Sequence, residues 1–109
     1  RLNEQWQKEN PEKWESYVQR SLGARRSDRD EIGAMKQLLA RKNHDTYKRL
    51  AKIKCETLII GGRYDGIAPP ENLISMNEMI RRSELRFYEG GHMFLIQDKS
   101  AYQEIIAWL

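Results

Sequence analysis

The chain has 109 residues, of which 39% are hydrophobic and 32% are charged, and its formal net charge is +3. These values are typical of one small soluble globular domain and give no indication of a disordered chain. The longest uncharged apolar run, residues 58–60, is far shorter than the roughly 20 residues that a transmembrane helix needs, and no signal sequence is recognisable. We therefore expect a cytoplasmic protein without a membrane partner.

The charge is distributed unevenly along the chain. Residues 1–54 carry 14 Lys and Arg against 8 Asp and Glu, whereas residues 55–109 carry 5 against 8. A basic half can indicate a nucleic-acid surface, but here charges of opposite sign alternate, which is more typical of a solvated helix face. We therefore expect no nucleic-acid partner. The single cysteine, Cys55, and two histidines far apart in the sequence predict neither an internal disulfide nor a metal site, and we expect no cofactor.

Helix signals organise the first half of the chain. A helix is predicted from Pro11, which follows a possible cap at Asn10, to Gly23. A second helix begins near residues 27–30, and a third, shorter one follows Asp45. Apolar side chains recur at helical spacing in all three: Trp14, Tyr17, Val18 and Leu22, then Ile32, Met35, Leu38 and Leu39, then Tyr47 and Leu50. Such stripes could line a ligand pocket, but packing against neighbouring helices is the favoured interpretation.

The hydrophobic pattern changes in the second half. Residues 57–61 form a short apolar run without polar alternation, which is typical of a strand buried on both faces of a parallel sheet. A helix begins at Pro69 and Pro70, residues 85–89 return as a second strand, and Asp98 is expected to cap a final helix. The residues expected to face inward are Leu73, Met76, Met79 and Ile80 in the first helix and Ala101, Ile105, Trp108 and Leu109 in the final one. This strand-helix-strand crossover predicts an α/β fold.

Two chemically active residues follow the two predicted strands. Asp65 lies in the sequence GGRYDG, and His92 lies directly after two glycines in YEGGHMF. Open α/β sheets keep their ligands at the carboxyl ends of the strands, and glycines allow the sharp turns that point a side chain over the sheet edge. An imidazole with an ordinary pKa of about 6.5 suits proton transfer near neutral pH, and a neighbouring aspartate would fix its tautomer. Taken singly, each residue is equally typical of an ordinary turn.

These features together resemble the C-terminal end of the α/β-hydrolases. The resemblance covers residues 53–109, where the strand TLIIG, the acid in RYDG, the turn IAPPE and the turn GGHMF occur in the family's order. Residues 1–52 resemble, more loosely, the helical cap or lid segment that many members insert before this point. The sequence of the GGHMF turn is similar to that of small-molecule esterases, lactonases and haloperoxidase-like members of the family.

The resemblance implies a Ser-Asp-His catalytic set acting on an ester, lactone or related small-molecule substrate. Asp65 would be the acid, His92 the base, and Tyr64, Met93 and Phe94 would be candidates for the substrate pocket. Core filling is an equally good interpretation of Met93 and Phe94.

The sequence departs from the family in one respect, because no Gly-x-Ser-x-Gly motif is present. We therefore expect the nucleophile to precede this chain, which would be the C-terminal fragment of a hydrolase and inactive alone. The missing N-terminal part of the fold would then be its partner, and an uncovered sheet edge predicts possible self-association without it. The alternative is a non-catalytic binding or interaction module on the same fold.

Overall fold

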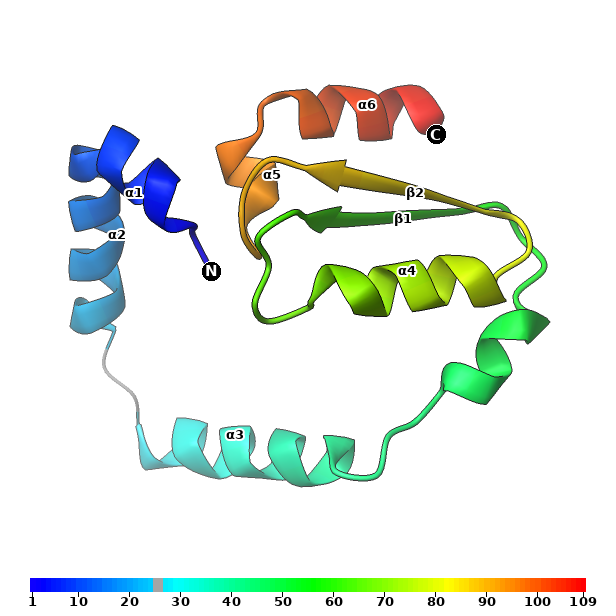
Figure 1. The fold of residues 1–109 in the computed structure, drawn as a ribbon. Helices are drawn as coiled ribbons and strands as arrows, with labels where there is room; N and C mark the ends of the chain where they lie inside the picture. Colours follow the sequence, from blue (N-terminus) through cyan, green and yellow to red (C-terminus); the bar gives the residue numbers. More distant parts are fainter. Residues whose placement is uncertain (25–26) are drawn as a thin grey trace. The chain divides into compact units, whose positions relative to one another are not determined.

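A computed structural model describes residues 1–24 and 27–109. Its contacts divide the chain into two compact units, one formed by Arg1–Glu9 with Tyr47–Leu109 and the other by Asn10–Thr46. The elements in chain order are α1 (Glu4–Glu9), α2 (Pro11–Gly23), α3 (Asp28–Arg41), η1 (Tyr47–Lys52), β1 (Thr57–Gly62), α4 (Pro70–Met79), β2 (Ser83–Tyr88), α5 (Phe94–Gln97) and α6 (Ser100–Trp108) (Figure 1). Residues on both sides of the helical segment α2–α3 therefore belong to the unit that contains the strands.

The two strands pair in parallel, as the crossover pattern predicts. Thr57 lies opposite Ser83 and Gly62 lies opposite Tyr88, so β1 and β2 are in register over their whole length. The first strand agrees with the predicted residues 57–61 and continues one residue further. The second was predicted two residues too late at its start and one too late at its end. Pairing already begins where the Thr57 N–H donates to the Arg82 carbonyl oxygen (2.9 Å).

Apolar side chains cover both faces of this small sheet. On one face, Ile59 packs with Leu73 of α4 and with Ile80, and these three are buried. On the other face, Tyr88 packs with two buried residues that follow it, Phe94 and Ala101. Figure 1 shows α4 along one side of the strands and α5 and α6 along the other. Burial on both faces explains why β1 shows an unbroken apolar run instead of an alternating one.

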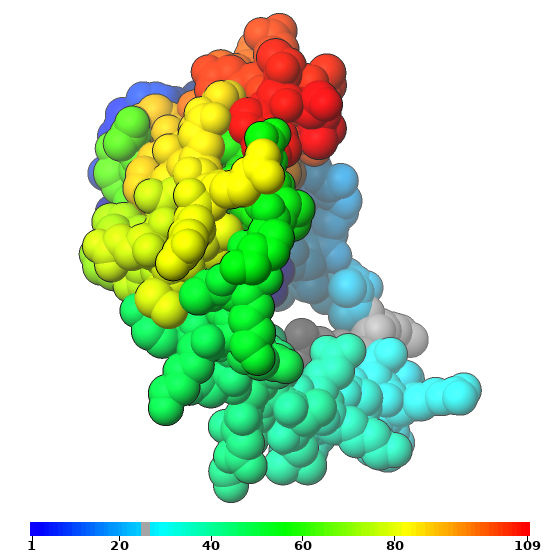
Figure 2. Space-filling view, turned by 90° about the vertical axis from the view of Figure 1, so that its right-hand side faces the viewer, coloured from blue at the N-terminus to red at the C-terminus, as the bar shows by residue number. Residues whose placement is uncertain are grey.

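The end of α6 lies beside the amino ends of the strands. Trp108 lines a surface pocket together with Glu56, Thr57, Arg82, Ser83 and Glu84. In the space-filling view the last residues of the chain, in red, accordingly lie next to green and yellow segments (Figure 2). The structure thus confirms a final helix that closes one side of the sheet.

Several details of the helices differ from the prediction. The structure contains two short helices that the sequence did not indicate, α1 and α5, and the predicted third helix is a 3-10 helix. Helix α6 has Lys99 at its N-cap position, although the Asp98 carboxylate still accepts the Ser100 N–H (3.0 Å). Met76 and Leu109 were expected to face inward, but both are exposed. Met76 lies on the solvent side of α4, and Leu109 follows the last residue of α6.

The unit formed by Asn10–Thr46 contains the two longer helices α2 and α3. Helix α3 begins at Asp28, within the predicted range 27–30, and is capped by Ser27, whose hydroxyl oxygen accepts the Asp30 N–H while the Asp30 carboxylate accepts the Ser27 N–H. The apolar side chains of α3 are nevertheless exposed, namely Ile32, Met35, Leu38 and Leu39. The structure therefore does not show the packing that the sequence favoured for this stripe. Among the described helices, none is long and apolar enough to cross a membrane.

Candidate active site

Asp65 is held by the loop that follows β1. Its Oδ1 atom accepts the backbone N–H groups of Ile67 (2.8 Å) and Ala68 (3.0 Å), and its own N–H donates to the Gly62 carbonyl oxygen (3.3 Å). Aspartate commonly closes a turn in this way, because its short side chain reaches backbone N–H groups two or three residues ahead. The side chain is only 4% exposed. One carboxylate oxygen is thus built into the loop, and the other remains available.

His92 lies in the turn that follows β2. Gly90 has a φ of 132°, in a region that residues with a Cβ atom rarely adopt, and this lets the chain reverse immediately after the strand. The turn reverses again through a hydrogen bond from the Phe94 N–H to the Gly91 carbonyl oxygen (3.0 Å). The imidazole that results from this arrangement is 45% exposed. The glycines before His92 therefore do place its ring at the carboxyl end of the sheet.

The two predicted catalytic residues contact each other directly. His92 Nδ1 lies 2.8 Å from Asp65 Oδ2, although 27 residues separate them in the sequence. An ionised carboxylate can only accept hydrogen bonds, so Nδ1 must carry the proton in this contact. In the neutral imidazole, the Nε2 atom is then unprotonated and able to accept a proton from another group. This is the tautomer that a general base requires.

Asp65 is ionised at neutral pH. Burial by itself raises the pKa of this carboxyl group, but the hydrogen bonds from the Ala68 N–H, the His92 ring and the Ile67 N–H together outweigh it. The net pKa lies below the ordinary value of 3.8. The carboxylate therefore keeps the charge that it needs to orient the imidazole and to stabilise an imidazolium.

We expect this lowered pKa to make the stability of the protein depend on pH. A group whose pKa is lower when folded contributes stability that is complete above its unfolded pKa and is lost as the pH falls through the folded value. The advantage of the native protein over an Asp65→Asn variant should therefore shrink below about pH 4. Thermal unfolding of both proteins between about pH 3 and pH 6 measures this difference. A stability difference between the two proteins that stayed constant across this pH range would contradict a lowered pKa of Asp65 in the folded protein.

The backbones of the two turns are joined at the edge of the sheet. The Arg63 N–H donates to the Tyr88 carbonyl oxygen (3.0 Å), and the Tyr64 N–H donates to that of Gly90 (2.9 Å). At Gly62 the approach is so close that a Cβ atom would lie 2.6 Å from the Gly90 carbonyl oxygen. The loops that carry the acid and the base thus form one continuous structure.

A comparison with known proteins finds a related sequence. The chain is 36% identical over 76 residues to the AB hydrolase superfamily protein YisY of Bacillus subtilis (strain 168), a match that covers 69% of this chain and 28% of that relative. The chain is related to the α/β-hydrolases. It spans little more than a quarter of the relative's length. No model of a protein family and no solved structure matches it.

The candidate pocket residues suggested by the α/β-hydrolase resemblance lie in different surroundings. Tyr64 is 59% exposed beside Asp65, and Met93 is half-buried beside His92. Phe94 is buried in the core, where its ring stacks on that of Tyr88 with 5.5 Å between the ring centroids. Phe94 therefore fills the core under the histidine turn, which is the second of the two interpretations that the sequence allowed.

The structure also shows contributors to this candidate site that the sequence did not indicate. The Gly91 N–H donates to Gln97 Oε1 (2.9 Å), and the Glu89 N–H donates to Asp98 Oδ2 (2.9 Å). Asp98 was expected only as a helix cap, and no sequence signal indicated Gln97. Among the described residues, no group of three or more His, Cys, Asp or Glu side chains could hold a metal ion.

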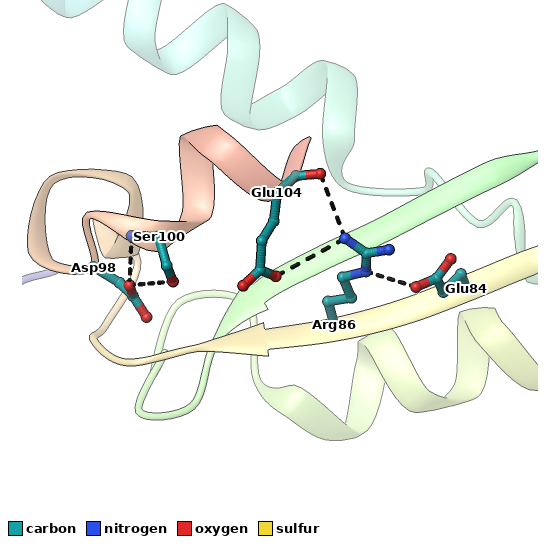
Figure 3. A network of polar contacts seen from close by, with 5 residues as sticks. All are labelled: Glu84, Arg86, Asp98, Ser100 and Glu104. Atoms are coloured by element: carbon teal, nitrogen blue, oxygen red, sulfur yellow. Dashed lines mark hydrogen bonds and ion pairs between the residues drawn. The ribbon is translucent and has the colours of Figure 1, made fainter. Parts of the chain in front are cut away.

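Charged contacts on the α6 side lie beside this turn and β2. Arg86 pairs with Glu84 (2.6 Å) and lies 3.9 Å from the Glu104 carboxylate, while the Ser100 hydroxyl donates to Asp98 (2.7 Å) (Figure 3). The Ser100 hydroxyl is the main reason why the pKa of Asp98 is lowered, so this carboxylate stays charged while it accepts the Glu89 N–H. These contacts fix α6 and the end of β2, and none of them reaches the imidazole.

Proposed function

We propose that this chain is part of a serine-type α/β-hydrolase that acts on an ester, a lactone or a related small-molecule carbonyl compound. In this proposal the chain supplies the acid, Asp65, and the base, His92. The observation that carries the proposal is the 2.8 Å contact between Asp65 Oδ2 and His92 Nδ1, made by an acid that is buried and a ring that is half exposed. The relationship to an α/β-hydrolase superfamily protein supports it.

The proposed chemistry follows from the free nitrogen of the ring. His92 Nε2 would accept the proton of a serine hydroxyl as the serine oxygen attacks the substrate carbonyl carbon. The same nitrogen would then protonate the leaving alcohol, and a water molecule activated in the same way would release the acid product. Asp65 would hold the tautomer and stabilise the transient imidazolium.

The serine in this proposal belongs to a part of the protein outside these 109 residues. None of the serines in the chain lies in a Gly-x-Ser-x-Gly motif. The coverage of only 28% of the relative agrees with this division of the site. The remaining part of the fold would therefore be the partner of this chain in a cytoplasmic enzyme, and within the predicted cap segment 1–52 the helices α2 and α3 would cover the substrate entrance.

The proposal predicts that a serine-directed covalent probe distinguishes the full-length protein from the isolated chain. A fluorophosphonate forms a stable bond only with a serine that a neighbouring base activates. We expect it to label the full-length protein, to label the His92→Ala variant at a rate lower by about 100-fold or more, and to leave residues 1–109 alone unlabelled. Mass spectrometry of the intact proteins measures the adduct.

The exposed histidine His44 provides a matched control, since His44→Ala removes an imidazole without touching the site. Labelling that is equal in the His92→Ala and His44→Ala variants would exclude His92 as the base. A full-length protein that is folded but never labelled would favour the non-catalytic binding module.

A further inference from the structure

The turn that carries His92 is held by two consecutive side chains from the end of α5. Gln97 Oε1 accepts the Gly91 N–H (2.9 Å), and Asp98 Oδ2 accepts the Glu89 N–H (2.9 Å). Gly91 directly precedes His92, so its peptide group determines where the backbone of the histidine starts. Gln97 is therefore the side chain that binds the turn closest to the imidazole.

Gln97 is itself held in place at the other end of its amide group. Its Nε2 atom donates to Asn3 Oδ1 (2.6 Å), across 94 residues of sequence, and Asn3 Oδ1 also accepts the Trp6 N–H (3.1 Å) at the start of α1. The neighbouring Leu2 is buried. The Gln97 side chain also lies against Gly90, where an added Cβ atom would be 2.9 Å from Oε1. Contacts on two sides thus restrict the rotamer of Gln97.

The residues before α1 reach the same turn through their backbone. The Met93 N–H donates to the Arg1 carbonyl oxygen (3.2 Å). Backbone contacts on both sides of His92, at Gly91 and at Met93, therefore depend on the arrangement of Gln97 and residues 1–3. Among the described residues, Asp65 is the hydrogen-bond partner of the imidazole, so the turn sets the position of the ring and Asp65 sets its rotation.

We infer that Gln97 is a positioning residue for His92 and that Asn3 fixes the orientation of its amide. An amide is needed at this place because it must accept from the Gly91 N–H and donate to Asn3 Oδ1 at the same time. Glutamate can only accept, and methionine can do neither in comparable strength. The consequence for catalysis rests on the proposed function, whereas the position of the ring does not.

The test compares Gln97→Met with Gln97→Glu in the full-length protein. Gln103→Met is the matched control, because Gln103 is an exposed glutamine on α6. A misplacement of about 1 Å can reduce a rate by 100-fold, so we expect Gln97→Met to lower kcat of ester hydrolysis by about 10-fold or more, with KM changed less than about 2-fold. Gln97→Glu keeps the acceptor for Gly91 and should lose less than Gln97→Met.

A second readout follows the ring without any turnover. The Nδ1 proton that His92 donates to Asp65 should give a resolved downfield resonance in the proton NMR spectrum. We expect this resonance to be retained in Gln103→Met, shifted in Gln97→Glu, and broadened or lost in Gln97→Met. If Gln97→Met does not fold, the Gln97→Glu spectrum decides, since an unshifted resonance there contradicts the inference.

The two readouts separate this inference from the proposed function. Hydrolysis that is insensitive to His92→Ala would refute the proposed function, and the NMR comparison would still decide whether Gln97 positions the ring. A Gln97→Met variant that matches Gln103→Met in both kcat and the Nδ1 resonance would overturn the positioning role even if the hydrolase is confirmed.

Discussion

In the full-length hydrolase proposed above, Asp65→Asn is expected to lower kcat of ester hydrolysis by about 10,000-fold while the protein stays folded. The asparagine carbonyl oxygen can replace Oδ1 and accept the N–H groups of Ile67 and Ala68, so the loop keeps its hydrogen bonds. The amide NH2 group then takes the place of Oδ2, 2.8 Å from His92 Nδ1. A donor at this point forces Nδ1 to accept and moves the ring proton to Nε2, where the base has to be unprotonated. Steady-state hydrolysis of short p-nitrophenyl esters near neutral pH measures the loss.

Two further variants define what this result means. Asp28→Asn makes the same chemical change at an exposed aspartate in α3 and should leave kcat within about 2-fold of the native value. Asp65→Ala should also lose stability, because it leaves the Ile67 and Ala68 N–H groups without their acceptor, at a cost of about 1–3 kcal/mol. Native kcat in Asp65→Asn would show that Asp65 is only a turn residue.

Gly62→Ala is expected to destabilise the protein by about 3 kcal/mol, near the upper end for overpacked positions. The added Cβ atom would lie 2.6 Å from the Gly90 carbonyl oxygen and even closer to that of Gly91. Both obstacles are backbone atoms of the histidine turn, so they cannot move aside by changing a rotamer. The two turns must separate instead, which should also weaken the contact between Asp65 and His92. Urea unfolding measures the loss of stability, and the Nδ1 proton resonance of His92 reports on the contact.

Gly66→Ala is the appropriate comparison for this variant. Gly66 lies in the loop that follows Gly62, yet a Cβ atom built there would have no neighbour within 4 Å. Its alanine variant should differ from the native protein by less than about 0.5 kcal/mol. Equal stability of the two glycine variants would show that the close approach at Gly62 does not hold the turns together.

The sequence predicted those parts of the site that depend on local pattern. The buried apolar run of β1 indicated an interior strand, and the glycines near Asp65 and His92 indicated turns at the ends of both strands. Parallel pairing then brings the two strand ends to one edge, which is why a pair separated by 27 residues could be anticipated. The family resemblance supported the same pair by a separate route.

The parts that could not be predicted depend on distant contacts or on competing packing. Gln97 binds Asn3 across 94 residues, and no local pattern marks either residue. Phe94 was a pocket candidate because it lies near His92 in the sequence, but the buried ring of Tyr88 offers it a stacking partner in the core. The predicted second strand, residues 85–89, left out Ser83, whose hydroxyl donates to the Ile80 carbonyl oxygen (2.6 Å) just before the strand.

The two oxygens of the Asp65 carboxylate have different partners, and this links the order of the loop after β1 to the orientation of the His92 ring. One oxygen holds two backbone N–H groups and the other holds the imidazole, and the two oxygens belong to one rigid, planar group. Rotation about the bond between Cβ and Cγ therefore breaks both sets of contacts together. A change in this one side-chain torsion would therefore disturb the hydrogen bonds of the loop and the orientation of the imidazole at the same time.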